Sequence, residues 1–423
     1  MFEKVIQLFK IKDLRNKIIF VLALLVVFRL AAAIPVPGID IGQLKNFFES
    51  NQLFGLLNIF SGGAMKNFSI VMLGVAPYIT ATIIMQLLTM IFPQLENMYK
   101  EEGEAGKQKF NQISRLLCVP LGVLQGYAMI MLLQKQGVIA FPNNLTLITA
   151  IIVITAGTVF LMWLGELISE KGIGNGVSLL IFAGIIAGIP SAVREIIINW
   201  DPSKISLFAG FGVMAILIIL GVVIITEGTR NIPVSYAKRV RGHKMYGGFS
   251  TYLPMRVNNA GVIPIIFAIS IMLFPGMAAA FLSQTNIAWL STGAVFVDDL
   301  FKNPIIYGAL YFILVLAFTY FYTAITFDPK NISSNLQKQG GFIPGVRPGE
   351  HTTSFIQHIL NRTTLVGAIF LGVIAVLPFI IQSATNIGAL AIGGTALLIV
   401  VSVVLETMKQ IDSQLTMRDY EGF

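Results

Sequence analysis

Ten apolar segments constrain the fold of this chain more than any other feature. Each is about 20 residues long, the length that a helix needs to cross the hydrocarbon core of a bilayer. Because lipid offers no hydrogen-bonding partner, a chain inside it satisfies its backbone polar groups by forming helices. The composition agrees, with 55% hydrophobic and 12% charged residues and a mean hydropathy of +0.79. The sequence therefore predicts an all-α membrane protein with ten transmembrane helices, at residues 18–36, 70–92, 113–133, 146–167, 176–193, 206–226, 259–281, 304–326, 363–382 and 387–407.

The basic residues predict which way the chain crosses the membrane. With the N-terminus placed in the cytoplasm, 22 Lys and Arg fall in the inner segments and 6 in the outer loops. Such a bias marks the cytoplasmic side, so we expect both termini there. The opening residues F-E-K-V-I-Q-L-F-K-I-K-D favour a basic amphipathic helix lying on the membrane before the first span. Inner loops of this charge also predict contact with anionic lipids.

An internal repeat relates the two parts of the chain. Residues 74–86 and 261–273 are identical at seven of thirteen positions, and residues 176–181 resemble 394–399. The first pair lies on spans two and seven and the second on spans five and ten, as a duplication of five spans predicts. Because five is odd, the second half enters the membrane from the opposite side. We therefore expect two inverted, pseudo-symmetric halves, residues 1–200 and 201–423, around a central pore.

Inverted repeats of this kind usually place the working site near mid-membrane, where the halves meet. Ile79 and Ile266 are aligned by the repeat, and each is predicted to lie roughly 10 Å deep, from opposite faces. Val75 and Ile79 are four residues apart, so they share one helical face. Taken singly, such aliphatic residues are more often lipid or packing contacts. The repeat favours a role for them at the interface of the halves.

The chemistry that the chain lacks narrows its function. Arg29, Glu166 and Glu227 are the clear charges within the spans, and both glutamates lie near inner helix ends, where pairing is cheap. The run G-I-G-N-G at 172–176 follows no strand, and a tight helix connection is the better interpretation. Neither a catalytic constellation nor metal-ligand spacing is found, so we expect no enzymatic activity, no cofactor and no metal.

A pore without a polar binding site remains. A ring of branched aliphatic side chains seals by dewetting and offers no specific contact to a passing solute. Residues 51–68 hold a short apolar stretch and then Ser-Gly-Gly, which predicts either a re-entrant helix or an outer amphipathic hairpin.

Several motifs, running along the whole chain, make a family resemblance specific. They are I-P-V-P-G-I-D at 34–40, F-S-G-G-A at 60–64, P-Y-I-T-A-T-I-I-M-Q-L-L at 77–88, G-I-G-N-G at 172–176, N-I-P-V-S-Y-A-K-R from 231, S-T-Y-L-P-M-R-V-N-N-A-G-V-I-P at 250–264 and G-G-F-I-P-G-V-R-P-G-E at 340–350. With these motifs the chain resembles the SecY/Sec61-alpha family of protein-conducting channels. The resemblance implies an hourglass pore with an outer plug helix and a lateral gate that opens to lipid.

The resemblance also implies roles for particular residues. The pore ring would comprise Val75, Ile79, Val177, Ile181, Ile266 and Ile399. The plug would comprise Leu53, Phe54, Leu56, Leu57, Ile59, Phe60, Ser61, Gly62 and Gly63. The lateral gate would lie between Thr80, Ile83 and Gln86 of span two and Ile266, Ser270 and Phe274 of span seven. A docking surface for a motor or ribosome would comprise Lys238, Arg239, Arg241, Lys244 and Arg347.

As the resemblance implies, the function would be secretion of unfolded polypeptides across the bacterial cytoplasmic membrane and lateral insertion of transmembrane helices into it. The implied partners are the small membrane subunits SecE and SecG, the SecA motor ATPase, the ribosome with its RNA phosphates, signal sequences and nascent chains. An inverted-repeat secondary transporter of a small solute is one alternative, although few ionisable groups lie at mid-depth to couple it. A scaffold subunit with no conduit is another.

Overall fold

A computed structural model provides the structure of the chain. It describes residues 11–36, 61, 63–65, 67–135, 137–139, 143–198, 205–236, 239–241, 244–246, 250–282, 292–293, 296–297, 301, 303–385 and 393–421. The predicted amphipathic helix falls largely before this range. Its described part, from Lys12, continues into the first span without a break.

Each of the ten predicted spans overlaps a long helix. In chain order these helices are α2 (Lys12–Ala33), α5 (Ala76–Ile91), α7 (Gly103–Lys135), α8 (Asn144–Lys171), α9 (Gly176–Ile198), α10 (Ile205–Glu227), α11 (Ile263–Leu282), α13 (Pro304–Thr326), α15 (Glu350–Thr385) and α16 (Gly393–Glu421). Within the described residues, 5 helices are long and apolar enough to cross a membrane on their own, and a bent pair makes a sixth. The fold is that of an all-α membrane protein.

The second span departs from the prediction at its start and ends within one residue of the predicted position. Its helix was expected from residue 70, but residues 70–75 form turns and α5 begins at Ala76, with Pro77 in its first turn. Proline suits a first turn because its missing N–H would have no partner there. At the other end, α5 breaks at Phe92, and the short helix α6 (Pro93–Lys100) leaves at 115°. Residue 93 is again a proline, which ends the hydrogen bonding of α5.

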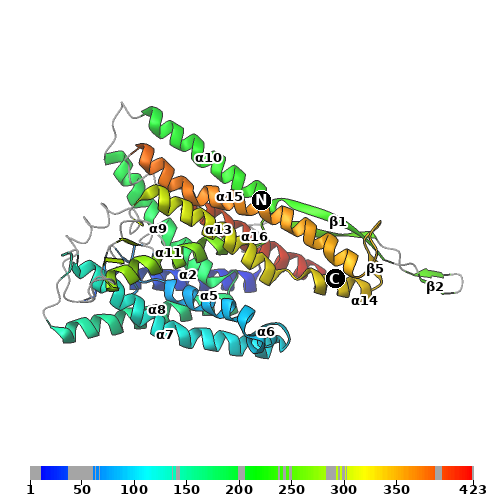
Figure 1. Cartoon of the computed structure of the whole chain (residues 1–423), viewed down its shortest axis with the longest axis horizontal. Coiled ribbons are helices and arrows are strands. Elements are labelled where there is room, and N and C mark those ends of the chain that lie inside the picture. The colour runs from blue at the N-terminus through cyan, green and yellow to red at the C-terminus, as the bar shows by residue number, and fades with distance from the viewer. Residues whose placement is uncertain are drawn as a thin grey trace.

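The helices lie roughly along the long axis of the molecule, and the strands lie toward one end (Figure 1). We call this end, which also carries α6 and the short helix α14 (Pro329–Lys338), the strand end. Helix α5 leads into α6 and so runs toward the strand end. Helix α11 follows strand β4 (Ser250–Arg256), which lies at the strand end, and so runs away from that end. These opposite directions are what the inverted repeat predicts for spans two and seven.

The two halves of the chain contact each other through two separate groups of helices. Helix α11 packs against α5 and α7, and α16 packs against α9. Within the second half, α13 lies between α11 and α15.

The strand end contains a small sheet that hydropathy does not predict. Strand β1 (Thr229–Tyr236) pairs antiparallel with β4 (Ser250–Arg256) on one side and with β5 (Gly341–Phe342) on the other. Ile232 and Val234 alternate with exposed residues along β1 and pack on the first turns of α15. The sheet thus joins two loops that lie far apart in the sequence.

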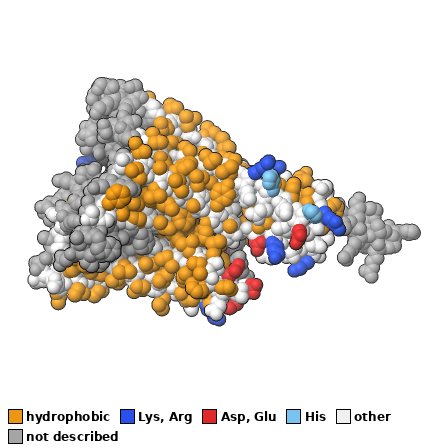
Figure 2. Space-filling model, viewed as in Figure 1, with side chains coloured by type: hydrophobic (Ala, Val, Ile, Leu, Met, Phe, Trp, Pro, Cys, Tyr) orange, Lys and Arg blue, Asp and Glu red, His pale blue; other side chains and the backbone are white. Residues whose placement is uncertain are grey.

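The surface agrees with a position in lipid. On the face shown in Figure 2, hydrophobic side chains cover the middle of the molecule, and charged and histidine side chains gather toward the strand end. Large apolar side chains are exposed on the outward helices, including Leu30, Ile216 and Leu220. An exposed apolar surface of this extent is typical of contact with a membrane.

Candidate functional site

The six residues of the predicted ring belong to one apolar cluster. Val75, Ile181, Ile266 and Ile399 are buried in it, while Ile79 and Val177 pack against it from partly buried positions. Val75 directly precedes α5, which carries Ile79, and α9 carries Val177 and Ile181. Ile266 lies in α11 and Ile399 in α16, so each half contributes two helices. Branched aliphatic side chains have no hydrogen-bonding group, so their packing excludes water and holds no ion.

Glycine packing fixes the start of α9, which carries Val177 and Ile181. The Gly176 N–H donates to Ser169 Oγ at 2.9 Å, and Ser169 Oγ donates to the Gly165 carbonyl at 3.0 Å. A Cβ on Gly176 would collide with that same carbonyl oxygen. The G-I-G-N-G run is therefore a tight connection between α8 and α9, as predicted.

The predicted gate residues belong to α5 and α11, which pack against each other. Thr80, Ile83 and Ser270 are buried. The Thr80 hydroxyl donates to Ala76 O at 2.9 Å, and the Ser270 hydroxyl donates to Ile266 O at 2.9 Å. Each of these hydrogen bonds stays within its own helix. Phe274 has its backbone in α11, but its side chain lies outside the described part of the chain.

Two amides add polar groups to this region. Gln86 Oε1 is buried and has no hydrogen-bond partner among the described residues. Gln125 of α7, which sequence reasoning missed, is buried and its Nε2 donates to Thr80 Oγ1 at 3.4 Å. Its position as a lone amide in the middle of an apolar span was the available signal, because polar side chains inside spans usually face protein.

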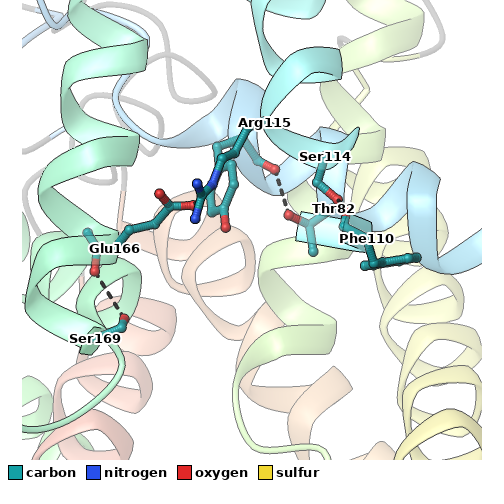
Figure 3. A network of polar contacts seen from close by, with 8 residues as sticks. Thr82, Phe110, Ser114, Arg115, Glu166 and Ser169 are labelled. Carbon is teal, nitrogen blue, oxygen red and sulfur yellow. Dashed lines mark hydrogen bonds and ion pairs between the residues drawn. The ribbon is translucent and has the colours of Figure 1, made fainter. Parts of the chain in front are cut away.

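Both glutamates within the predicted spans are paired. Arg115 Nε of α7 lies 2.6 Å from Glu166 Oε1 of α8, as Figure 3 shows. Glu227, at the end of α10, accepts Lys409 Nζ of α16 at 2.8 Å. Pairing removes the cost of a lone charge near the membrane, and here it also ties neighbouring helices together.

The predicted plug falls mostly outside the described residues. Leu53, Phe54, Leu56, Leu57, Ile59, Phe60 and Gly62 are not described. Ser61 is buried, and its Oγ accepts from the Met65 N–H at 3.3 Å. Gly63 has a φ of 80°, which favours glycine. Ala64, directly after it, is buried in the same apolar cluster as the ring.

The predicted docking residues lie at the strand end. Lys238 is not described, and Arg239, Arg241 and Lys244 have described backbones only. They form the hairpin of β2 (Arg239–Arg241) and β3 (Lys244–Tyr246), which projects from the rest of the molecule in Figure 1. Arg347 is exposed in the loop between β5 and α15.

Comparison with known proteins agrees with this geometry. Residues 69–408 match the SecY family. The chain is 45% identical over 436 residues to the protein translocase subunit SecY of Halalkalibacterium halodurans, covering 100% of both chains. It is 43% identical over 431 residues to that of Mycobacterium bovis, covering 97% of both.

Solved structures share the fold. The structure of a protein conducting channel superposes with a TM-score of 0.62 at 19% identity, covering 93% of this chain and 90% of that one. Sec61 in a canine ribosome-channel complex from the endoplasmic reticulum gives a TM-score of 0.56 at 20% identity, with the same coverage. Because the family model matches residues 69–408 and full-length relatives are 43–45% identical, the chain belongs to the SecY family.

Proposed function

We propose that this chain is the membrane channel of a bacterial protein translocase. Unfolded secretory polypeptides cross the cytoplasmic membrane through it, and apolar helices leave it sideways into lipid. Its relatives are protein translocase subunits, and the solved proteins that share its fold are protein-conducting channels.

The observation that carries the proposal is the apolar cluster shared by both halves. Val75, Ile79, Val177, Ile181, Ile266 and Ile399 form the pore ring in this proposal. A ring of aliphatic side chains accommodates any polypeptide sequence because it makes no specific contact, and it seals when nothing passes. A carrier for a small solute would need polar groups there to recognise its substrate.

The lateral gate in this proposal lies between α5 and α11. We assign Thr80, Ile83 and Gln86 to this gate from one half of the chain, residues 1–200, and Ser270 and Phe274 from the other, residues 201–423. The helices part there because their contact is mainly apolar, and an incoming apolar segment replaces one such contact by another. The plug, residues 51–68, blocks the outer side until a chain enters.

The partners follow from the charge of the strand end. Lys238, Arg239, Arg241, Lys244 and Arg347 dock a ribosome or the SecA motor, since basic groups bind RNA phosphates without reading sequence. The small subunits SecE and SecG cover part of the exposed apolar surface, and anionic lipids border it. Both termini lie in the cytoplasm. The channel hydrolyses nothing, so a motor, a ribosome or the membrane potential supplies the energy.

Crosslinking tests the conduit directly. Single cysteines replace Ile79 and Ile266, and a secretory chain with a cysteine in its middle is stalled during export. We expect a disulfide to form at both ring positions and none at the matched control Ile216→Cys, which faces lipid from α10. No crosslink at either ring position, with normal export, would refute the proposal.

A second measurement separates the channel from a small-solute carrier. Polar substitution of Ile79 and Ile266 should make membrane vesicles leak ions if the ring is a seal. Loss of uptake of a small solute without any leak would favour the carrier.

A further inference from the structure

We infer that Thr352 and Ser333 are positioning residues that hold the loop of Arg347 in the shape that docks a ribosome. The inference rests on the proposed docking role of Arg347. Neither hydroxyl touches the docked partner in this scheme. Both act through the backbone of residues 347–349.

The two hydroxyls reach the loop from two different helices. Thr352, in the first turn of α15, donates from Oγ1 to the Arg347 carbonyl at 3.0 Å. Ser333 of α14 donates from Oγ to the Gly349 carbonyl at 2.9 Å. The anchored carbonyls lie two residues apart, with Pro348 between them. Since proline fixes its own φ, little freedom remains in this stretch.

Burial makes these hydrogen bonds costly to lose. Thr352 and Ser333 are each 3% exposed, whereas the loop they hold is at the surface. The Gly349 carbonyl also accepts from the Thr353 N–H at 3.1 Å and from Thr353 Oγ1 at 3.3 Å, so loss of the Ser333 hydroxyl frees the contact with α14 but leaves this carbonyl bonded. Loss of the Thr352 hydroxyl removes the donor to the Arg347 carbonyl, and a hydrogen bond lost from a buried donor costs free energy. A helical threonine usually donates to the carbonyl four residues before it, as Thr363 does to Ile359 at 3.1 Å. Thr352 instead donates to a carbonyl that lies outside its helix.

The other side of the loop is anchored by apolar contact and by glycine geometry. Val346 packs on the cluster beneath the sheet, next to buried Ile343, and its N–H donates to Ile343 O at 3.0 Å. Gly345 and Gly349 have φ values of 82° and 99°, which other residues adopt only with strain. Arg347 therefore stands between two fixed segments, with its side chain exposed.

A fixed backbone matters for an exposed arginine that binds phosphate. Ordering a flexible side chain and its loop on binding costs free energy, and a loop already in the bound shape avoids part of that cost. Guanidinium contacts to phosphate are also directional, so a displaced loop loses them.

The test measures binding of non-translating ribosomes to the full chain in lipid nanodiscs, at low and moderate salt. The variants are Thr352→Val, which removes the donor at constant shape, Ser333→Ala, and Thr352→Ser, which keeps the donor. Thr363→Val is the matched control on the same helix. Arg347→Ala and the double variant Arg347→Ala/Thr352→Val complete a double-mutant cycle.

We expect Arg347→Ala to weaken binding most, and Thr352→Val and Ser333→Ala to weaken it about two- to tenfold. Thr352→Ser should restore binding, Thr363→Val should leave it unchanged, and Thr352→Val should add nothing once Arg347 is absent.

Three results would overturn the inference. An equal loss from Thr352→Val with and without Arg347 would show that the hydroxyl acts on something other than this arginine. Normal binding by Thr352→Val and Ser333→Ala, together with weak binding by Arg347→Ala, would refute the positioning role while leaving docking intact. Normal binding by Arg347→Ala would refute the docking role itself.

Discussion

The gate interface and the strand end use their hydroxyl groups in opposite ways. At the gate, Thr80 and Ser270 donate to carbonyls of their own helices, so the contact between α5 and α11 is left mainly to apolar side chains. At the strand end, Ser333 and Thr352 donate to another element. Apolar contact is non-directional, whereas hydrogen bonds fix geometry. These four hydroxyls thus differ in whether they tie separate segments together.

The largest expected effect comes from placing a polar group in the ring. Ile266→Asn buries an amide without a partner, which costs roughly 2–7 kcal/mol in the closed state and favours hydration of the pore. We expect ion leak through vesicles that contain this variant. Ile266→Val, which keeps a branched aliphatic side chain, should stay sealed, and a sealed Ile266→Asn variant would show that the apolar cluster is not the barrier.

At the strand end, the next largest effect should come from the core beneath the sheet. Ile232 is buried there, and Ile232→Ala should destabilise this region by about 2–5 kcal/mol through the cavity it leaves. Hydrogen exchange of strands β4 and β5 should accelerate, with a smaller change for Ile232→Val. Ion leak caused by Ile232→Ala would show that the core of the strand end and the seal at the ring depend on each other.

A steric change next to the gate should have a somewhat smaller effect. Gly157 of α8 lies against the Ile70 carbonyl, which a Cβ would strike, so Gly157→Ala must push the segment before α5 away. We expect a loss of about 1–3 kcal/mol, seen as a lower Tm in detergent. Gly188→Ala is the matched control, because a Cβ there meets nothing within 4 Å. Equal Tm values for the two variants would contradict close packing at Gly157.

The smallest effect should come from the polar contact between Gln125 of α7 and Thr80 of α5. Gln125→Leu removes the hydrogen bond to Thr80, and interhelical bonds in membranes contribute about 1 kcal/mol or less. The rate of disulfide formation between single cysteines on α5 and α11 should change only slightly. A change as large as that caused by Ile266→Asn would mean that this contact, rather than apolar packing, holds the gate.

The apolar helices were easier to predict from sequence than the strand end, because a chain in lipid must satisfy its backbone polar groups by forming helices. Hydropathy located a helix for every span, and for α13 it gave both ends. It failed where helices leave the membrane. Helix α15 begins at Glu350, well before the predicted 363, and α16 runs to Glu421 instead of 407. Polar helical turns in water carry no hydropathy signal.

The strand end could not be predicted in this way. The alternation of Ile232 and Val234 indicates a strand, but nothing local pairs β1 with β5. The repeat identified Ile79 and Ile266, which the structure brings to one cluster. It could not identify Gln125, Ser333 or Thr352, since their partners depend on tertiary contacts.

The three strands of the sheet are not synthesised one directly after another. Strands β1 and β4 are complete before α11 is synthesised, but β5 arrives only after α11 and α13 have followed. Gly341 can pair with Tyr236 only if α11 has crossed the membrane and α13 has returned. If either helix failed to insert, β5 would emerge on the wrong side and the edge of β1 would stay open. In the proposed topology, this small sheet can therefore close only after both spans have crossed the membrane.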